Sequence, residues 1–388
     1  MLRLRSSTLT LGFVIALLAG GLVSAQVVAA ETVEPQSLGR AFAKLQKEKK
    51  LKIAYLGGPI TAGVSATNSW RAGTTGWFQR NFPQAKITEV LAAAGGGSEY
   101  GAFRFRKDVM EQDPDVVFVE FAVDDADRDE RRTLRSIEGI VRQYWTSNPW
   151  GELVFVYTAS KKTALGGDVA GTPKTVGLHQ AIAKHYGIPA IDIGGALAEA
   201  MKNGATWGSL TTDGTQPNDA GTAVYLRAIE SFLAAQQKTP AGQPLVVLPD
   251  PLAKDPFSGA YVAGATSSYA PGWRKEMIPA DGSPRHIEAD QPGTELEHTF
   301  TGSTVGLFLV VGPDGGDLEC RINDGPPQRI SSFELKPDAL GRVRCVILAD
   351  DLASSKEHKL SIRILPEKQP ESKGTKVRLA AVFTHCDC

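Results

Sequence analysis

The chain has 388 residues, with 42 lysines and arginines against 43 aspartates and glutamates, and 42% of its residues are hydrophobic. This length and composition predict a globular protein with room for two domains. The net charge of −1 excludes the strong basic excess of a dedicated DNA- or RNA-binding protein. The four cysteines have no zinc-ligand spacing, so structural zinc is not expected, and the sequence indicates no cofactor.

The first 30 residues have the pattern of an export signal. Arg3 and Arg5 precede an apolar run at 11–22, which is followed by the small-residue sequences Val-Ser-Ala and Val-Ala-Ala. This run is too short for a transmembrane anchor, and no later stretch of the chain reaches the necessary length. The pattern therefore predicts a secreted or periplasmic protein without an integral membrane segment.

Short apolar strands alternate with amphipathic helices over residues 51–237. This alternation predicts an α/β domain, placed at 31–240, in which helices flank both faces of a parallel sheet. In chain order, the expected strands lie at 53–56, around Val90, and at 115–123, 153–157 and 188–193, and the expected helices lie at 101–112, 131–144, 176–186 and 219–237.

The pattern changes after residue 237, where prolines and glycines predict a linker at 241–255. Beyond the linker, strand-like runs are separated by turn sequences and no helical pattern intervenes. Such runs predict an antiparallel, jelly-roll-like β-sandwich at 256–388. Its expected strands lie at 297–300, 305–311, 318–322, 343–348, 358–365 and 377–383.

Export makes disulfide bonds possible. Cys320 and Cys345 both lie in strand-like runs of the predicted sandwich, and we expect them to pair. Cys386 and Cys388, in the terminal Cys-Asp-Cys sequence, could bond to each other in a strained ring, bridge to another chain or stay free. The sequence indicates no particular oligomeric state.

Four short motifs follow the expected strands, where ligands bind in open parallel sheets. They read Gly57-Gly-Pro-Ile-Thr61, Gly95-Gly-Gly-Ser98, Phe118-Val-Glu-Phe-Ala-Val-Asp-Asp125 and Thr212-Asp-Gly-Thr-Gln-Pro-Asn-Asp-Ala-Gly221. In this order and spacing they resemble the motifs of the SGNH/GDSL hydrolase superfamily, and most closely those of its secreted carbohydrate esterases. The resemblance covers residues 50–235 and implies a flavodoxin-like α/β fold with an ester-cleaving site.

Three positions of these motifs lack the residues on which that chemistry depends. The resemblance implies a serine nucleophile at Pro59, an oxyanion-binding asparagine at Asp124 and a histidine base at Gln216, three residues after the matching Asp213. Proline offers neither a hydroxyl nor an N–H group, and an ionised aspartate only accepts hydrogen bonds. An amide cannot take up the proton of a nucleophile. Esterase chemistry by a Ser-His-Asp triad is therefore not expected.

Other residues of the motifs are candidates for binding or for rebuilt chemistry. Gly58 and Gly95 could present backbone N–H groups to a ligand, and Ala93 is the alternative to Gly95. Thr61 and Ser98 could act as displaced nucleophiles. We favour hydrogen bonds within the turns for both, because no base follows them.

Three carboxylates, Asp124, Asp125 and Asp213, could meet at the site and share a proton, hold a cation or cleave glycosides. We favour the simpler interpretation that Asp125 caps the following helix and that Asp213 supports its own loop through backbone N–H groups. Trp207, shortly before the last motif, is a candidate for stacking on a sugar ring.

Together these features predict an exported pseudo-esterase that binds a carbohydrate or an acylated polysaccharide and has no nucleic-acid partner. One alternative is an active carbohydrate esterase or other hydrolase that uses a retained carboxylate or a displaced hydroxyl. A second alternative is a structural partner in an envelope assembly.

Overall fold

The computed structural model describes seven stretches of the chain, and the predicted export signal lies outside them. The described residues are 36–63, 66–165, 173–240, 245–264, 271–275, 285–335 and 343–386. No helix within these stretches is long and apolar enough to cross a membrane.

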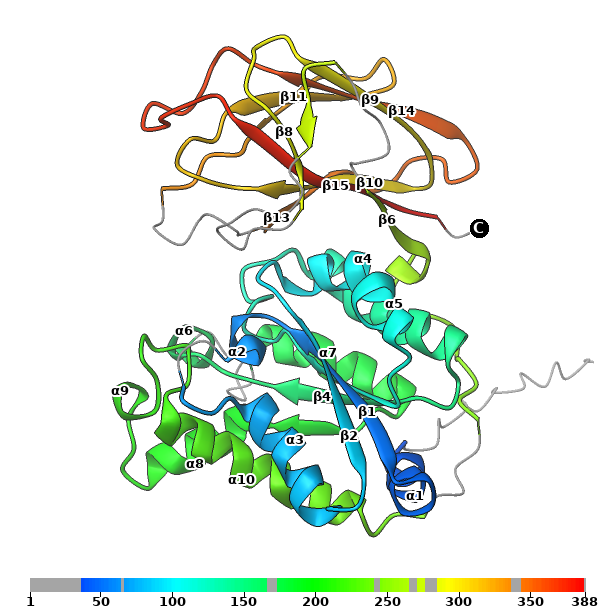
Figure 1. Ribbon diagram of the computed structural model, residues 1–388, viewed down its shortest axis with the longest axis vertical. Coiled ribbons are helices and arrows are strands. Elements are labelled where there is room, and N and C mark those ends of the chain that lie inside the picture. Colours follow the sequence, from blue (N-terminus) through cyan, green and yellow to red (C-terminus); the bar gives the residue numbers. More distant parts are fainter. Residues whose placement is uncertain are drawn as a thin grey trace, which may run out of the picture. The chain divides into compact units, whose positions relative to one another are not determined.

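The first half of the chain forms a parallel sheet with the strand order β2-β1-β3-β4-β5 (Figure 1). Its strands are β1 (Lys50–Gly57), β2 (Lys86–Ala93), β3 (Val116–Glu120), β4 (Glu152–Tyr157) and β5 (Ala190–Asp192). Every residue of β3 and β4 is buried, because the sheet is covered on both faces. The predicted α/β fold is confirmed.

Helices cover the two faces of this sheet in two separate hydrophobic clusters. On one face pack α1, α3, α8 and α10, and on the other pack α4, α5 and α7. Alternate residues of β1 enter the two clusters: Tyr55 faces the first and Leu56 the second. The helices are α1 (Gly39–Glu48), α2 (Pro59–Ala62), α3 (Trp70–Asn81), α4 (Gly97–Asp108), α5 (Glu130–Ser147), α6 (Lys161–Leu165), α7 (Lys174–Tyr186), α8 (Ile193–Lys202), α9 (Trp207–Leu210) and α10 (Asp219–Gln236).

Glu152, the first residue of β4, holds the N-terminus of α1. The helix has no side-chain cap from its own N-cap residue, Leu38. The two carboxylate oxygens of Glu152 instead accept hydrogen bonds from the backbone N–H groups of Arg40 and Ala41, at 2.9 and 3.0 Å. The side chain is buried, and this burial raises the pKa of Glu152 to about 7.

We expect the contribution of Glu152 to stability to fall as the pH rises from 4.5, its ordinary pKa, to about 7. The folded protein holds the Glu152 proton more tightly than the unfolded chain does, so deprotonation favours unfolding. Over the full range the loss amounts to as much as about 3 kcal/mol. Urea denaturation of the wild type and of Glu152→Gln at pH 5 and pH 8 isolates this group. The variant should gain stability relative to the wild type at pH 8, and an equal difference at both pH values would contradict the raised pKa.

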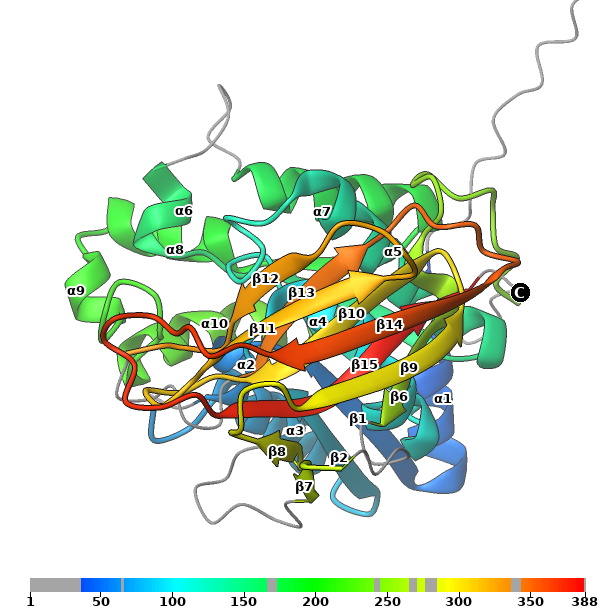
Figure 2. The same cartoon turned by 90° about the horizontal axis from the view of Figure 1, so that it is seen from above.

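The second half of the chain forms two antiparallel sheets. One has the order β13-β10-β15-β8-β7, with β6 also paired to β15, and the other has the order β12-β11-β14-β9 (Figure 2). The predicted all-β sandwich is thereby confirmed. Its strands are β6 (Ala260–Gly264), β7 (Arg274–Lys275), β8 (Ile287–Ala289), β9 (Glu295–Thr301), β10 (Thr304–Val310), β11 (Asp317–Ile322), β12 (Gln328–Ser331), β13 (Val343–Ala349), β14 (Glu357–Ile364) and β15 (Val377–His385).

The sheet that contains β10 is buried on both faces. Leu307 points into the core between the two sheets, whereas its neighbour Phe308 packs against α4, with its ring 4.6 Å from that of Tyr100. Phe383 of β15 likewise lies 4.2 Å from the ring of Phe103 in α4. One hydrophobic cluster therefore extends from the α/β half into the sandwich.

The expected disulfide between Cys320 and Cys345 is wrong, because both cysteines are free thiols. Cys320 on β11 points into the core of the sandwich, whereas Cys345 on β13 points the other way and packs against the cluster shared with α4. The two side chains lie in different sheets on different faces, so their sulfur atoms do not meet. Cys386 takes part in a disulfide, and Cys388 lies outside the described residues.

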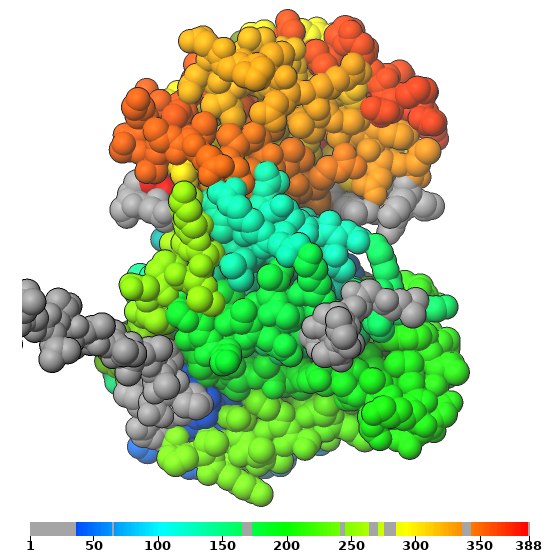
Figure 3. Space-filling model, turned by 180° about the vertical axis from the view of Figure 1, so that it is seen from behind, coloured from blue at the N-terminus to red at the C-terminus, as the bar shows by residue number. Residues whose placement is uncertain are grey.

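The described part of the predicted linker, 245–255, lies along helices of the α/β half (Figure 3). Glu138 of α5 accepts hydrogen bonds from two backbone N–H groups of this segment, at 2.6 and 2.7 Å. Arg142, one turn further along, donates a hydrogen bond to the backbone carbonyl of Pro249 at 2.8 Å. These bonds anchor the segment to α5.

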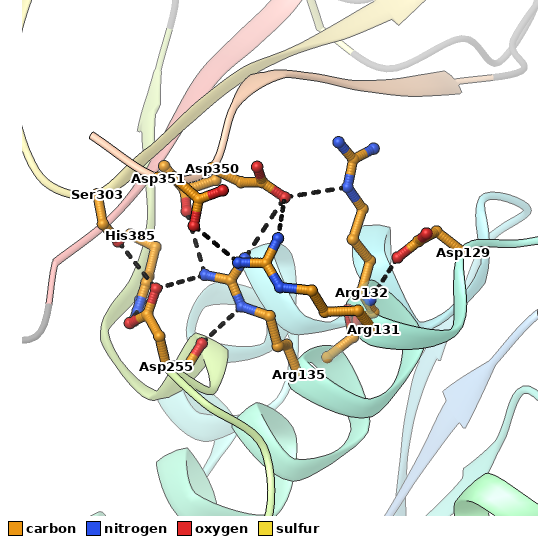
Figure 4. A network of polar contacts seen from close by, with 11 residues as sticks. Asp129, Arg131, Arg132, Arg135, Asp255, Ser303, Asp350, Asp351 and His385 are labelled. Carbon is orange, nitrogen blue, oxygen red and sulfur yellow. Dashed lines mark hydrogen bonds and ion pairs between the residues drawn. The ribbon is translucent and has the colours of Figure 1, made fainter.

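Three arginines of α5 bind acidic residues that follow the α/β half in the chain (Figure 4). The Arg135 side chain is fully buried and donates to the carboxylate and the backbone carbonyl of Asp255, at 2.5 and 2.6 Å. Its guanidinium also lies 4.2 Å from the centre of the Phe257 ring. Arg132 binds Asp350, which directly follows β13, at 3.2 Å. This network joins α5 to the sandwich.

Candidate active site

The first motif forms the turn between β1 and α2. Gly57 ends the strand, and Pro59 is the first residue of the helix. Proline suits that place because its fixed φ angle is helical and the first N–H group of a helix has no partner within the helix. The position that the resemblance assigns to the nucleophile therefore carries a well-accommodated residue with no hydroxyl and no N–H group.

The carboxylate of Asp124 lies directly over this turn. A Cβ atom added to Gly58 would be 1.7 Å from Oδ2 of Asp124, so only glycine leaves room for the carboxylate here. An ionised carboxylate accepts hydrogen bonds and cannot donate them. It would repel the negative charge that develops on the oxygen of an ester under attack. The structure thus brings together Gly58, Pro59 and Asp124 at the first turn.

Thr61, a candidate displaced nucleophile, is fully buried. Its hydroxyl donates to Oε2 of Glu120 at 2.8 Å, and the other oxygen of Glu120 accepts from the hydroxyl of Thr158 at 2.5 Å. Glu120 is also buried, and desolvation raises the pKa of its carboxyl group. Thr61 therefore joins α2 to β3 and, through Glu120, to the residue that follows β4. Its hydroxyl is buried and, contrary to the expectation, does not bond to the turn backbone.

Ser98 and Asp125 are fully buried together with His179. Asp125 accepts hydrogen bonds from the backbone N–H of Ser98 at 2.8 Å and from Nε2 of His179 at 3.1 Å. A Cβ atom at Gly97, which has a φ of 71°, would lie 2.6 Å from the Asp125 carboxylate. The pair formed by His179 and Asp125 has the composition of part of a catalytic triad. It lacks access to a substrate, so its role is to hold the second and third motifs together.

The expectation that Asp125 caps the following helix is wrong. Asp129 caps α5, and its side chain accepts a hydrogen bond from the backbone N–H of Arg132 at 2.9 Å. Three residues separate the two aspartates, and Asp125 instead turns inward to His179. The proposed binding role of Asp125 at the mouth of the site has no support from this buried position.

Asp213 and Gln216 lie in the loop between α9 and α10. Oδ1 of Asp213 accepts hydrogen bonds from the backbone N–H groups of Thr215 and Gln216, at 2.8 and 2.7 Å, which confirms its role in supporting the loop. The backbone carbonyl of Gly214 accepts a hydrogen bond from the backbone N–H of Lys161 at 2.7 Å. This bond attaches the loop to the segment that follows β4.

The three candidate carboxylates occupy separate settings. Asp124 covers the first turn, Asp125 is enclosed beside His179, and Asp213 is exposed in its loop. Within the part of the chain that the structure describes, no three His, Cys, Asp or Glu side chains are grouped so that they could hold a metal ion. A rebuilt site that uses all three carboxylates together is therefore not formed.

A pocket of about 270 Å³ opens at the carboxyl ends of β4 and β5. The half-buried side chain of Trp207 forms part of its wall, which brings this binding candidate to a cavity. Gly95, by contrast, faces open space. Tyr157 and Asp192, which end the two strands and line the pocket, were not among the predicted site residues. The rule that ligands bind at the carboxyl ends of parallel strands would have pointed to both residues.

Comparison with known proteins assigns this half of the chain to a family. Residues 55–224 match the model of the GDSL-like lipase/acylhydrolase family. The α/β half is therefore a GDSL-like lipase/acylhydrolase domain with the SGNH-type fold that its motifs predicted.

Two crystal structures match nearly the whole chain. The first, a two-domain esterase (CEX) active on acetylated mannans, superposes with a TM-score of 0.78 at 20% identity, covering 91% of this chain and 97% of that one. The second is CEX co-crystallized with mannopentaose, with a TM-score of 0.76 at 20% identity over 92% and 96% of the two chains. At this identity the likeness establishes the fold of both halves. No curated protein sequence matches this chain significantly.

Proposed function

We propose that this protein is an exported, non-catalytic relative of the SGNH carbohydrate esterases that binds a carbohydrate or an acylated polysaccharide. The observation that carries the proposal is the turn at Gly58 and Pro59. The first residue of α2 lacks both a hydroxyl and an N–H group, and the Asp124 carboxylate lies where an esterase needs hydrogen-bond donors.

The combined losses leave little catalysis at this turn. Removing one oxyanion donor lowers the rate of an esterase about 10²- to 10³-fold. Enzymes without their triad still react roughly 10³- to 10⁴-fold faster than the uncatalysed reaction in water, because the oxyanion hole and substrate binding remain. Here the oxyanion donors are impaired as well. The remaining candidates, Thr61, Ser98 and the pair of Asp125 and His179, are buried and cannot contact an ester.

Three observations support a carbohydrate as the ligand. The chain shares the fold of both halves with an esterase described as active on acetylated mannans. Trp207 stands at the wall of a pocket on the ligand-binding edge of the sheet. The pattern of residues 1–30 supports export to a compartment where such polymers occur.

We expect the purified mature protein to release no acetate from acetylated mannan or acetylated xylan above the buffer blank, and to bind at least one of these polysaccharides in affinity electrophoresis. Asp213→Ala should not change the rate of release, and Asp324→Ala, an exposed turn residue of the sandwich, is the matched control. Turnover that only Asp213→Ala abolishes would overturn the proposal in favour of an active hydrolase. If the protein neither releases acetate nor binds any of these polysaccharides, the result would favour a structural partner in an envelope assembly.

A further inference from the structure

The pocket at the ends of β4 and β5 contains a buried hydroxyl group that is unsatisfied within the protein. Tyr157 lines the pocket and is only 4% exposed. Among the described residues its hydroxyl has no hydrogen-bond partner. Burial raises the pKa of Tyr157, so the phenol stays protonated and remains a donor. A buried donor without a partner is costly, and a ligand oxygen in the pocket would satisfy it.

Small residues keep the pocket open. A Cβ atom added to Gly194 would already be 3.4 Å from the Cβ of Ala159. At Gly195 it would be 2.4 Å from the carboxylate of Asp192, whose Oδ1 accepts a hydrogen bond from the Gly195 N–H at 2.8 Å. Asp192 thus caps α8 from the rim of the pocket, and its second oxygen is available to accept a hydrogen bond from a ligand.

The charge of the lining indicates the class of ligand. The described residues that line the pocket include no lysine or arginine, and Asp192 is their single acidic residue. A phosphate, sulfate or uronate would find no cation there. The apolar surfaces of Trp207 and Met201 lie together with the polar groups of Tyr157 and Asp192. This combination suits a pyranose ring, which has an apolar C–H face and hydroxyl groups around its edge.

We propose that this pocket, whose lining does not include the turn that carries Pro59, binds one uncharged pyranose unit of a glycan. The Tyr157 hydroxyl donates to a sugar oxygen, Asp192 accepts from a sugar hydroxyl, and the Trp207 ring lies against the sugar face. This inference rests on the proposed function and adds the position and the chemical class of the binding site.

Isothermal titration calorimetry of the mature protein with mannopentaose, xylopentaose and cellopentaose tests the proposal. For a sugar that the wild type binds, Tyr157→Phe should weaken the affinity about 5- to 10-fold through the loss of one hydrogen bond. Ala198→Phe, which fills the pocket from an exposed position on α8, should abolish binding. Lys202→Phe places the same ring on α8 outside the lining and should leave the affinity unchanged.

Thermal unfolding separates binding from a structural role of Tyr157. The melting temperature of Tyr157→Phe should equal or exceed that of the wild type, because the hydroxyl has no described partner to lose. If both Tyr157→Phe and Ala198→Phe bind the sugar as tightly as the wild type does, the pocket is not the sugar site, and the proposed function still stands. A wild type that binds none of the three sugars would overturn both.

Discussion

The triple variant Pro59→Ser, Asp124→Asn, Gln216→His should hydrolyse 4-nitrophenyl acetate at least about 10³-fold faster than the wild-type protein. Serine restores the hydroxyl and the N–H group at the first residue of α2, asparagine supplies a donor where the carboxylate lies over Gly58, and histidine supplies the base. Asp213 already lies three residues before the new histidine. Initial rates of nitrophenolate release measure the gain directly.

The single variants are the appropriate comparison, because nucleophile and base act as a unit and their effects are strongly non-additive. Pro59→Ser, Asp124→Asn and Gln216→His alone should each remain close to the wild-type rate. Adding Asp213→Ala to the triple variant should reduce the restored activity. A folded triple variant, verified by circular dichroism, that remains inactive would mean that the four motifs do not meet at one site.

Arg135→Met should lower the free energy of unfolding by about 3–5 kcal/mol, the usual cost of removing one partner from a buried ion pair. Methionine keeps much of the side-chain volume but leaves the Asp255 carboxylate without its cation at 2.5 Å and Asp350 without its contact at 3.5 Å. It also removes the cation above the Phe257 ring. Urea denaturation at pH 7, monitored by tryptophan fluorescence, gives the difference.

Arg131→Met is the matched control for Arg135→Met. Arg131 lies on the same helix and binds Asp350 and Asp351, at 3.3 and 2.8 Å, but its side chain is 46% exposed. Exposed ion pairs contribute only about 0–1 kcal/mol, so this variant should retain nearly all of its stability. Equal losses in the two variants would show that burial of Arg135 does not set the strength of the network.

Local patterns predicted several long helices and missed others, among them the regular α1 and two helices with glycine in unfavourable positions. The α4, α5, α7 and α10 helices lie close to their expected positions. The α3 and α8 helices were not predicted, since α3 contains Gly73 and Gly76 and α8 begins Ile-Gly-Gly, which are poor helix-forming sequences. Tertiary packing stabilises both: a Cβ atom on Gly73 would lie 2.4 Å from Leu226 of α10, so glycine permits the close approach of two helices.

The sequence by itself determined the parallel sheet and the sandwich that follows it, and it placed Pro59 and Gln216 at two positions of the motifs. Each of these depends on residue type and on spacing along the chain. Only the tertiary structure decided that Cys320 and Cys345 face different cores, that Asp125 turns inward to His179, and that Tyr157 opens onto a pocket. Periodicity reports that a residue is buried, but the partner it meets depends on which sheet faces and strand ends the fold brings together.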